Sequence, residues 1–264
     1  MNEVNKTLYI PLYGKAYVSQ KSLFLRDDMA EKIWASEGFQ LTGKAKSKWL
    51  AYYMGMRAAV FDEWVMEQLN KYEEAVVLHI GCGLDSRVLR IGTKHMWYDI
   101  DFTEVIDERK RYYEEASNYR MIAADIRAHN WRQHIRETRC AIVAVEGVSM
   151  YVTNDELRAF MQEVSEHFDE AVLLMDCYTE LAAKLSTYKN PIHDVGVSRV
   201  YGVREPQTLQ SEAFTFVHEH TMTPVHFVQQ LNGIERFIFQ KLYAGRFSTK
   251  LYRLFSYRKK TSVQ

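Results

Sequence analysis

The sequence predicts an α/β fold in which a mostly parallel, doubly wound sheet of seven strands carries an N-terminal helical cap. From Ala75 onward, apolar runs alternate with helix-compatible segments, which is typical of a parallel sheet with helices on both faces. The first run ends in the two glycines of AVVLHIGCGLDSRVLR, a strand, turn and helix start that presents backbone N–H groups to a nucleotide-like ligand. About 70 residues with helical periodicity precede this turn.

The elements follow in chain order. In the cap, apolar residues recur at spacings of three and four over Asp28 to Trp34 and over Lys48 to Leu69, so both segments should be helices. The later predictions are helices over 103–117, 154–168 and 178–187, strands over 214–220 and 234–240, and a helix over 225–231 between those two strands. No repeat or Pro/Gly-rich linker interrupts the chain. We therefore expect one domain, made of a cap over 1–72, a core over 73–245 and a basic tail over 246–264.

Three successive apolar runs end in a carboxylate, at Asp101, Asp125 and Glu146. Parallel strands bring their carboxyl ends to one edge of the sheet, where open α/β sheets bind ligands. A dinucleotide-binding turn requires a third glycine where this chain has Ser86, which disfavours NAD. S-adenosylmethionine carries no phosphate, so a turn with two glycines suffices for it. Asp101 is placed to accept ribose hydroxyls in either case.

Composition narrows the class of protein. The chain has 264 residues, of which 47% are hydrophobic, enough for a large core. Its 34 basic and 34 acidic residues leave no net charge, so no overall electrostatic argument favours nucleic acid. The first residues lack the apolar core of a signal peptide, and no run approaches a membrane span. We expect a cytoplasmic protein with three reduced, buried cysteines, Cys82, Cys140 and Cys177.

Six segments resemble one family in order and spacing: PLYGKAYVS, MGMRAAVFD, LHIGCGLDSRVLR, WYDIDFTEVIDERK, AADIRAHNW and VEGVSMYVTNDEL. The chain resembles the leucine carboxyl methyltransferases and the bacterial polyketide O-methyltransferases grouped with them, from Tyr9 to about Asp176. The resemblance implies the Rossmann-like sheet of class I methyltransferases. It also implies S-adenosyl-L-methionine as cofactor and S-adenosyl-L-homocysteine as product.

The resemblance assigns roles at the methionine end of that cofactor. Lys15 and Arg57 match positions that hold the carboxylate of the methionine moiety, and an arginine can do so with two parallel hydrogen bonds. Gly81 and Gly83 would bring backbone close to the methionine and ribose portions. Glu146 matches a position facing the methionyl end, where a carboxylate could hold the ammonium or orient the sulfonium. Without the resemblance, Lys15 and Arg57 would be interpreted as ordinary surface cations.

At the other end, Asp101 would bind the ribose, and Asp125 with Ile126 would take the adenine. Asp101 and Asp125 could instead be helix N-caps. Tyr151 is expected to line the acceptor pocket, and with Glu146 it forms the predicted catalytic pair. The remaining implied cofactor-binding positions are Cys82, Phe102 and Gly147.

The implied activity is transfer of a methyl group to a carboxylate or phenolic oxygen of a small molecule, either polyketide-like or an organic acid. A carboxylate needs no general base at neutral pH, whereas a phenol would gain from a base or a cation. Candidates for that role are His193, Arg199, Tyr201 and Arg204. Two alternatives stay open: an NAD-dependent oxidoreductase and a non-catalytic S-adenosylmethionine-binding module.

Two histidines, His218 and His220, share one strand face, but no third metal ligand is evident, so we expect no metal site.

The tail after Gly245 interleaves basic with apolar residues and has no acidic residue. This pattern suits a membrane surface, an anionic partner, a carrier protein or a last helix packed on the sheet with a solvated basic face, of which we favour the helix.

Overall fold

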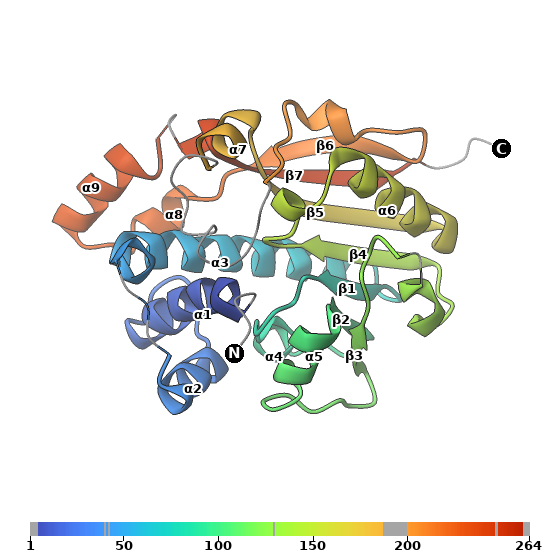
Figure 1. Ribbon diagram of the computed structural model, residues 1–264, viewed down its shortest axis with the longest axis horizontal. Coiled ribbons are helices and arrows are strands. Elements are labelled where there is room, and N and C mark those ends of the chain that lie inside the picture. Colours follow the sequence, from blue (N-terminus) through green and yellow to red (C-terminus); the bar gives the residue numbers. More distant parts are fainter. Residues whose placement is uncertain are drawn as a thin grey trace.

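Seven strands form one sheet in the order β3-β2-β1-β4-β5-β7-β6 (Figure 1). The computed structural model describes residues 5–39, 41, 43–128, 130–186, 200–245 and 248–260. The first five strands are parallel, and β7 runs antiparallel to both of its neighbours. The predicted fold class is therefore confirmed. The strands are β1 Val76–Ile80, β2 Trp97–Asp101, β3 Tyr119–Ala123, β4 Cys140–Val145, β5 Glu170–Tyr178, β6 Phe214–His220 and β7 Tyr252–Lys259.

Helices cover both faces of the sheet. The side chain of Val77 packs in one core with Phe61 and Val65, whereas Leu78 packs in a second core with Phe160 and Val164. All residues of β1 and β4 are buried, as expected for central parallel strands that are covered on both sides. The helices are α1 Asn5–Gln20, α2 Asp28–Glu37, α3 Lys48–Lys71, α4 Arg87–Ile91, α5 Thr103–Arg109, α6 Asn154–His167, α7 Glu180–Ser186, α8 Val225–Val228 and α9 Gly233–Leu242.

The cap consists of α1, α2 and α3, which lie together beside the sheet (Figure 1). The long helix α3 packs its buried face against the core and places Arg57 and Asp62 there. Contacts from α1 and from the start of α2 reach the turn after β1. The cap therefore covers the carboxyl end of the central strand, where the ligand edge was predicted.

The predicted strand over 234–240 is wrong, because this segment belongs to helix α9. Its N-cap is Asn232, whose side chain accepts the N–H of Glu235 at 2.9 Å. Ile234 and Phe237 are three residues apart and both exposed, whereas Phe239 is fully buried. An alternating strand would place 237 and 239 on the same face, so the observed burial follows the helical period.

The seventh strand comes from the basic tail, and the prediction of a last helix there is wrong. Strand β7 inserts between β5 and β6 and buries Leu254 and Phe255. Its cations have internal partners: Arg253 pairs with Glu219 at 2.6 Å, and Lys259 donates to the carbonyl of Phe168. This part of the tail is thus integral to the sheet. The proposed division of the chain at 72 and 245 stays a prediction.

Among the described residues, no helix combines the length and apolar character that a membrane crossing requires. The three cysteines are free and buried, as predicted.

Candidate active site

The turn between β1 and α4 contains two glycines in the left-handed region, with φ of +68° at Gly81 and +50° at Gly83. The N–H of Gly81 donates to the carbonyl of Ile100 at 2.8 Å. A Cβ atom on Gly81 would lie only 2.0 Å from Cγ2 of Val148. Both the backbone conformation and the close approach of the segment after β4 therefore require glycine at this position.

Asp101, at the end of β2, fixes the second half of the turn. Its Oδ2 accepts the N–H of Gly83 at 2.9 Å, and its Oδ1 accepts the N–H of Phe102 at 2.8 Å. Burial raises the pKa of Asp101, against the opposing effect of these two N–H groups. Because each carboxylate oxygen has two lone pairs, both oxygens retain capacity to accept from a ligand hydroxyl.

A buried polar network supports the turn from behind. Arg109 donates through NH1 to the carbonyl of Gly83 at 2.9 Å and through NH2 to Oδ2 of Asp99 at 2.5 Å. Asp99 also lies 2.8 Å from Nδ1 of His79 and accepts the Tyr119 hydroxyl at 2.6 Å. Burial alone would raise the pKa of Asp99, but Arg109, His79 and Tyr119 together lower it to about 2. The turn thus rests on a carboxylate that stays charged.

Arg57, delivered by α3, lies between two carboxylates and is 5% exposed. Its Nε and NH2 both reach Oε1 of Glu146 at 3.0 Å. Its NH1 donates to Oδ2 of Asp176 at 3.1 Å and to the hydroxyl of Tyr252 at 2.8 Å. The interpretation of Arg57 as a solvated surface cation is therefore wrong.

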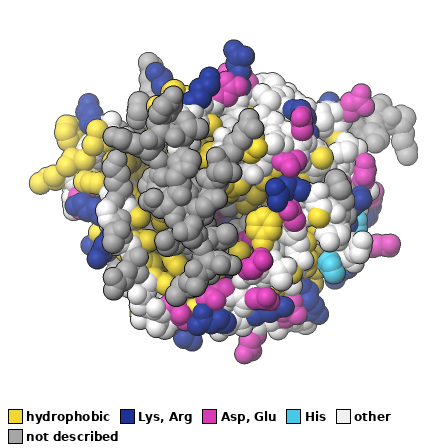
Figure 2. All heavy atoms as spheres, in the orientation of Figure 1, with side chains coloured by type: hydrophobic (Ala, Val, Ile, Leu, Met, Phe, Trp, Pro, Cys, Tyr) yellow, Lys and Arg dark blue, Asp and Glu magenta, His cyan; other side chains and the backbone are white. Residues whose placement is uncertain are grey.

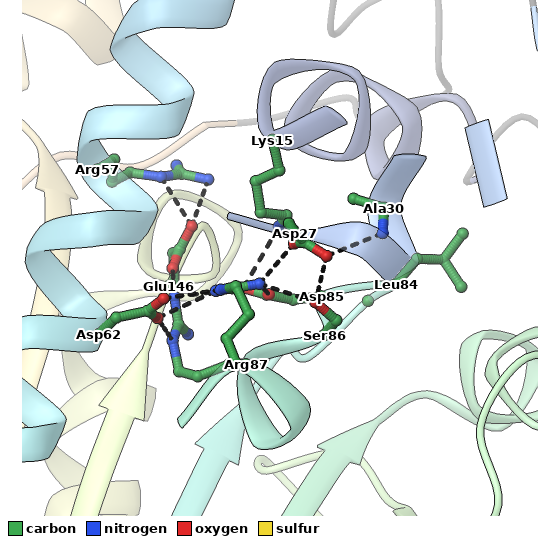
Figure 3. A network of polar contacts seen from close by, with 12 residues as sticks. Lys15, Asp27, Ala30, Arg57, Asp62, Leu84, Asp85, Ser86, Arg87 and Glu146 are labelled. Atoms are coloured by element: carbon green, nitrogen blue, oxygen red, sulfur yellow. Dashed lines mark hydrogen bonds and ion pairs between the residues drawn. The ribbon is translucent and has the colours of Figure 1, made fainter. Parts of the chain in front are cut away.

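Glu146 and Asp85 receive cations from both the cap and the core, and Lys15 and Arg57 point toward them in Figure 3. Lys15, which is 3% exposed, places Nζ 3.3 Å from Oδ2 of Asp85. Arg87 donates through NH2 to Oε2 of Glu146 at 2.5 Å and lies 3.2 Å from Asp85. Burial would raise the pKa of Glu146, but Arg57 and Arg87 hold it below its ordinary value. Lys15 and Arg57 are thus brought to neighbouring carboxylates at one place, as a shared role requires.

A second set of contacts fastens the cap to the turn. Asp27 is the N-cap of α2, and its Oδ1 accepts both the N–H of Ala30 at 2.8 Å and the hydroxyl of Ser86 at 2.5 Å (Figure 3). Its Oδ2 accepts from Arg90 at 2.6 Å, and Arg90 also donates to Asp62 of α3 at 2.7 Å. The residue that replaces the third glycine of a dinucleotide turn therefore joins α2 to the core.

A cavity of about 350 Å³ lies between the cap, the turn and the ends of β4, β5 and β7. Its apolar lining includes Leu50 and Met54 of α3 and Met150 after β4. Among the predicted site residues, those that line it are Lys15, Arg57, Gly81, Cys82, Gly83, Glu146, Gly147 and Tyr151.

The residues predicted to hold the adenosine do not line this cavity. Asp125 follows β3 and pairs with Arg127 at 2.6 Å, and this hydrogen bond lowers its pKa. Phe102 is 45% exposed, with the Arg127 guanidinium 6.0 Å from its ring centre, whereas Ile126 is buried. Asp101 ends β2 and Phe102 follows it, whereas Asp125 and Ile126 come shortly after β3, the strand beside β2.

Three tyrosines also line the cavity: Tyr151, Tyr178 and Tyr252. The rings of Tyr178 and Tyr252 meet edge to face with centres 5.0 Å apart. Burial raises the pKa of all three hydroxyls, so these side chains stay protonated at neutral pH.

The structure describes two of the four suggested helpers for a phenolic acceptor, and neither lines the cavity. Tyr201 and Arg204 are not among its lining residues, although the N–H of Tyr201 donates to the carbonyl of Met150 at 2.9 Å. His193 and Arg199 lie outside the described residues.

Four further residues of this charged site were not predicted from the sequence: Asp85, Arg87, Asp176 and Tyr252. Asp85 and Arg87 belong to the quoted Leu-Asp-Ser-Arg segment, and their charges so close to a glycine turn were the available signal. Asp176 lies near the end of β5, as Asp101 does in β2, so the pattern of acidic strand ends extends to it. Tyr252 gave no signal, because its strand was predicted to be a helix.

The described part of the chain holds no group of three His, Cys, Asp or Glu residues arranged to bind a metal ion. His220 instead lies 2.9 Å from the hydroxyl of Ser256 through Nε2.

The sequence profile of one family, described as leucine carboxyl methyltransferase, matches residues 10–165. The chain is 28% identical over 186 residues to the tetracenomycin polyketide synthesis O-methyltransferase TcmP of Streptomyces glaucescens, covering 69% of each protein. It is also 22% identical over 245 residues to the S-adenosyl-L-methionine-dependent methyltransferase dpfgK of Gibberella zeae, covering 84% of this chain and 82% of that protein.

Among solved structures, the magnesium protoporphyrin IX methyltransferase ChlM of Synechocystis superimposes with a TM-score of 0.53 at 13% identity. The match covers 88% of this chain and 93% of ChlM, whose structure contains bound S-adenosylhomocysteine. At this identity the likeness concerns the fold.

Proposed function

Because the chain belongs to the leucine carboxyl methyltransferase family, whose members are S-adenosylmethionine-dependent methyltransferases, we propose that it methylates a carboxylate oxygen of a small, largely apolar acceptor. The NAD-dependent alternative has no support in these findings. The observation that carries the proposal is that every described ionic group in the cavity already has a partner.

The described residues fit this cofactor. Gly81 and Gly83 line the cavity and have no side chains, so the backbone of the turn is accessible to a ligand there. Arg57 and Lys15 are buried cations suited to the methionine carboxylate, and Glu146 is a buried carboxylate suited to its ammonium. An amino-acid end that carries both charges could replace the present Arg57 to Glu146 pairing without leaving either group unpaired, which matters because an unpaired buried charge is strongly destabilising.

Farther along the sheet edge, we assign the ribose to Asp101 and the adenine to Asp125 and Ile126. Asp101 retains acceptor capacity on both oxygens beside the turn. Phe102, next in the chain, is exposed and offers an apolar surface to the adenosine. These assignments extend the family resemblance to the described side chains.

No described side chain in the cavity is available as a general base. Lys15 pairs with Asp85, and Arg57 pairs with Glu146. In His79, Nδ1 faces Asp99, and Nε2 must accept from Arg87 because an arginine only donates. A carboxylate acceptor is already ionised at neutral pH and needs no base, whereas a phenol would need help that these residues do not offer.

The rest of the lining indicates an apolar acceptor body. Leu50, Met54, Met150 and the ring of Tyr151 contribute carbon surface, and no described cation in the cavity lacks a carboxylate partner. A second charge on the acceptor would therefore be buried without compensation. A small aromatic or polyketide-like acid with one carboxylate suits this lining.

When bound, S-adenosylmethionine supplies an electrophilic methyl group on a positively charged sulfur. The contribution of the chain is positioning: Arg57, Lys15 and Glu146 fix the amino-acid end, and Tyr151 lies beyond Glu146 on the acceptor side. Correct alignment of two reactants is worth up to about 7–11 kcal/mol of the barrier. The cap buries Lys15 and Arg57 beside the cavity, and the attraction between an anionic acceptor and the cationic donor is stronger in such buried surroundings than in bulk water.

The test uses matched acceptors, in which aromatic carboxylic acids are compared with phenols that have the same ring. Purified protein is incubated with isotopically labelled S-adenosylmethionine, and the products are separated by mass spectrometry. We expect labelled methyl esters, which release methanol in mild alkali, and a rate on acids that is level between neutral and moderately basic pH. Alkali-resistant aryl ethers, with a rate that rises with pH, would contradict the proposal and identify a phenolic acceptor.

The cofactor assignment has its own test. Arg57→Ala should weaken S-adenosylhomocysteine binding by about tenfold or more, since the loss of a charge-assisted hydrogen bond is worth about 1.5–3 kcal/mol. Calorimetric titration of folded protein measures this change. Affinity equal to that of the wild type would contradict the assigned site.

A further inference from the structure

We propose that Asp176 and Tyr252 are positioning residues that hold one end of the Arg57 guanidinium, so that its opposite edge is presented to the methionine carboxylate of the cofactor. The inference rests on the role proposed above for Arg57. It does not depend on which oxygen accepts the methyl group.

The hydrogen count on Arg57 leads to this division of the guanidinium. An arginine has five N–H donors. The NH1 nitrogen donates to Asp176 at 3.1 Å and to the Tyr252 hydroxyl at 2.8 Å, which uses both of its hydrogens. The opposite edge, formed by Nε and NH2, is the one that faces Glu146 at 3.0 Å. A guanidinium can bind a carboxylate with two parallel hydrogen bonds through this edge or through the edge between NH1 and NH2. The second of these needs a hydrogen of NH1, and both of those are already used.

Tyr252 links the two charged groups. Its hydroxyl accepts from Arg57, and it donates to Oδ2 of Asp176 in a short contact. The three groups thus form a closed set in which Arg57 donates to both partners and Tyr252 donates to Asp176. Because Asp176 is fully buried and Arg57 nearly so, this arrangement holds the guanidinium against rotation about its long side chain.

Asp176 also fixes the other wall of the same site. Its Oδ1 accepts the N–H of Gly147 at 2.8 Å. Gly147 follows Glu146 directly, has φ of +72°, and would place a Cβ atom 3.7 Å from the Arg57 nitrogens. Asp176 therefore positions both the Arg57 guanidinium and the backbone next to Glu146, the carboxylate that faces this guanidinium.

Both residues come from the far side of the chain in sequence. Asp176 is on β5 and Tyr252 begins β7, and both lie beyond the residues 10–165 that match the family profile. Strand β7 pairs with β5 in a register that aligns Tyr178 with Tyr252 and Asp176 with Leu254. The seventh strand would thus contribute to cofactor binding as well as to the sheet.

The experiment measures recognition of the carboxylate itself. S-adenosylhomocysteine and its analogue with hydrogen in place of the carboxylate are each titrated by calorimetry into wild-type protein, Tyr252→Phe and Asp176→Asn. The readout is the dissociation constant of the analogue divided by that of S-adenosylhomocysteine. We expect this ratio to fall about tenfold in each variant, a factor that corresponds to about 1.4 kcal/mol. A general loss of structure would weaken both ligands equally and leave the ratio unchanged.

Tyr257→Phe is the matched control. Tyr257 is on the same strand, and its buried hydroxyl donates to the carbonyl of Pro206 at 2.9 Å, away from Arg57. Like Tyr252→Phe, this substitution removes one buried hydroxyl group, and it should keep the wild-type ratio. Circular dichroism and thermal unfolding establish that each variant is folded at the titration temperature.

Arg57→Ala in the same titration separates the role of Arg57 itself from the positioning role of Asp176 and Tyr252. If the ratio falls in Arg57→Ala but stays at the wild-type value in Tyr252→Phe and Asp176→Asn, the positioning role is refuted and the assignment of Arg57 stands. If Arg57→Ala also keeps the wild-type ratio, the assigned carboxylate site itself is wrong. A lower ratio in all three variants, with the wild-type ratio in Tyr257→Phe, supports the inference.

Discussion

The substitution Gly81→Ala tests whether glycine is required in the turn after β1 because Val148 lies so close or only because of the backbone conformation. Gly81 has φ of +68°, and a left-handed conformation costs about 1–2 kcal/mol for a residue with a Cβ atom. The new methyl group would also lie 2.0 Å from Cγ2 of Val148, an overlap that something must relieve by moving. Overpacking of this kind typically costs about 1–3 kcal/mol, so the total expected loss of stability is about 2–5 kcal/mol.

Two comparisons separate the components. Gly92→Ala has a similar φ of +59°, and its nearest neighbour would be the carbonyl oxygen of Leu89 at 3.8 Å, so it should show the conformational component alone. In a Val148→Ala background, the atoms nearest to the new methyl of Gly81→Ala would be Cβ of residue 148 at 3.5 Å and the carbonyl oxygen of Glu146 at 3.6 Å. Both are ordinary contacts, so Gly81→Ala should cost only about 1–2 kcal/mol there.

The assay is urea unfolding followed by far-ultraviolet circular dichroism for the wild type, the three single variants and the double variant. The coupling energy between positions 81 and 148 is then obtained from a double-mutant cycle. If Gly81→Ala is equally destabilising in both backgrounds, the steric reasoning is refuted. If it is no worse than Gly92→Ala in the wild-type background, the close approach of Val148 does not constrain the turn.

Asp99→Asn tests the charged support of the turn. The pKa of Asp99 in the folded state is lowered from 3.8 to about 2. Its ionisation therefore stabilises the fold at pH values above the unfolded-state pKa, and this stabilisation is lost as the pH falls toward 2. The difference in unfolding free energy between wild type and Asp99→Asn should therefore shrink by about 2 kcal/mol between about pH 5 and about pH 2, and a pH-independent difference would contradict the assignment. Asp27→Ala removes the N-cap of α2 and the carboxylate that accepts from buried Ser86 and from Arg90, although Arg90 keeps Asp62 and Asp85. It should cost about 3–5 kcal/mol in urea unfolding, against about 1 kcal/mol for the more exposed capping residue in Thr153→Ala. Equal losses would mean that the cap is not fastened through Asp27. Ile234→Lys places a charge on a side chain that is 77% exposed in α9 and should change stability by less than about 0.5 kcal/mol, whereas a large loss would indicate that this face is covered.

The sequence predicted the turn and the strand ends because those signals are local. The run from Ala75 into Gly81 and Gly83 needs only its own residues to specify a strand, a turn and a helix start. Asp101 was placed correctly beside the turn for the same reason, since β2 pairs directly with β1. The burial of Lys15 and Arg57 could be anticipated only through the family resemblance, because neither has a distinctive local pattern.

The seventh strand was predicted wrongly at both candidate positions. Residues 234–240 and the tail each mix apolar and charged residues over a short span, where helix and strand patterns are hard to separate. What makes 252–259 a strand is its pairing with β5 and β6, and those partners lie far from it in sequence. A strand held on both sides by others acquires its structure from them more than from its own propensity.

The amino-acid sequence alone therefore determined the class of fold, the glycine turn and the edge of the sheet at which a ligand would bind. Only the tertiary structure decided which charges meet there. Arg57 is 89 residues from Glu146, 119 from Asp176 and 195 from Tyr252, and nothing in the local pattern of any of them specifies the others. Buried charges are stable only when they are paired, and the pairing is set by how the cap helix and the distant strands pack around the same cavity.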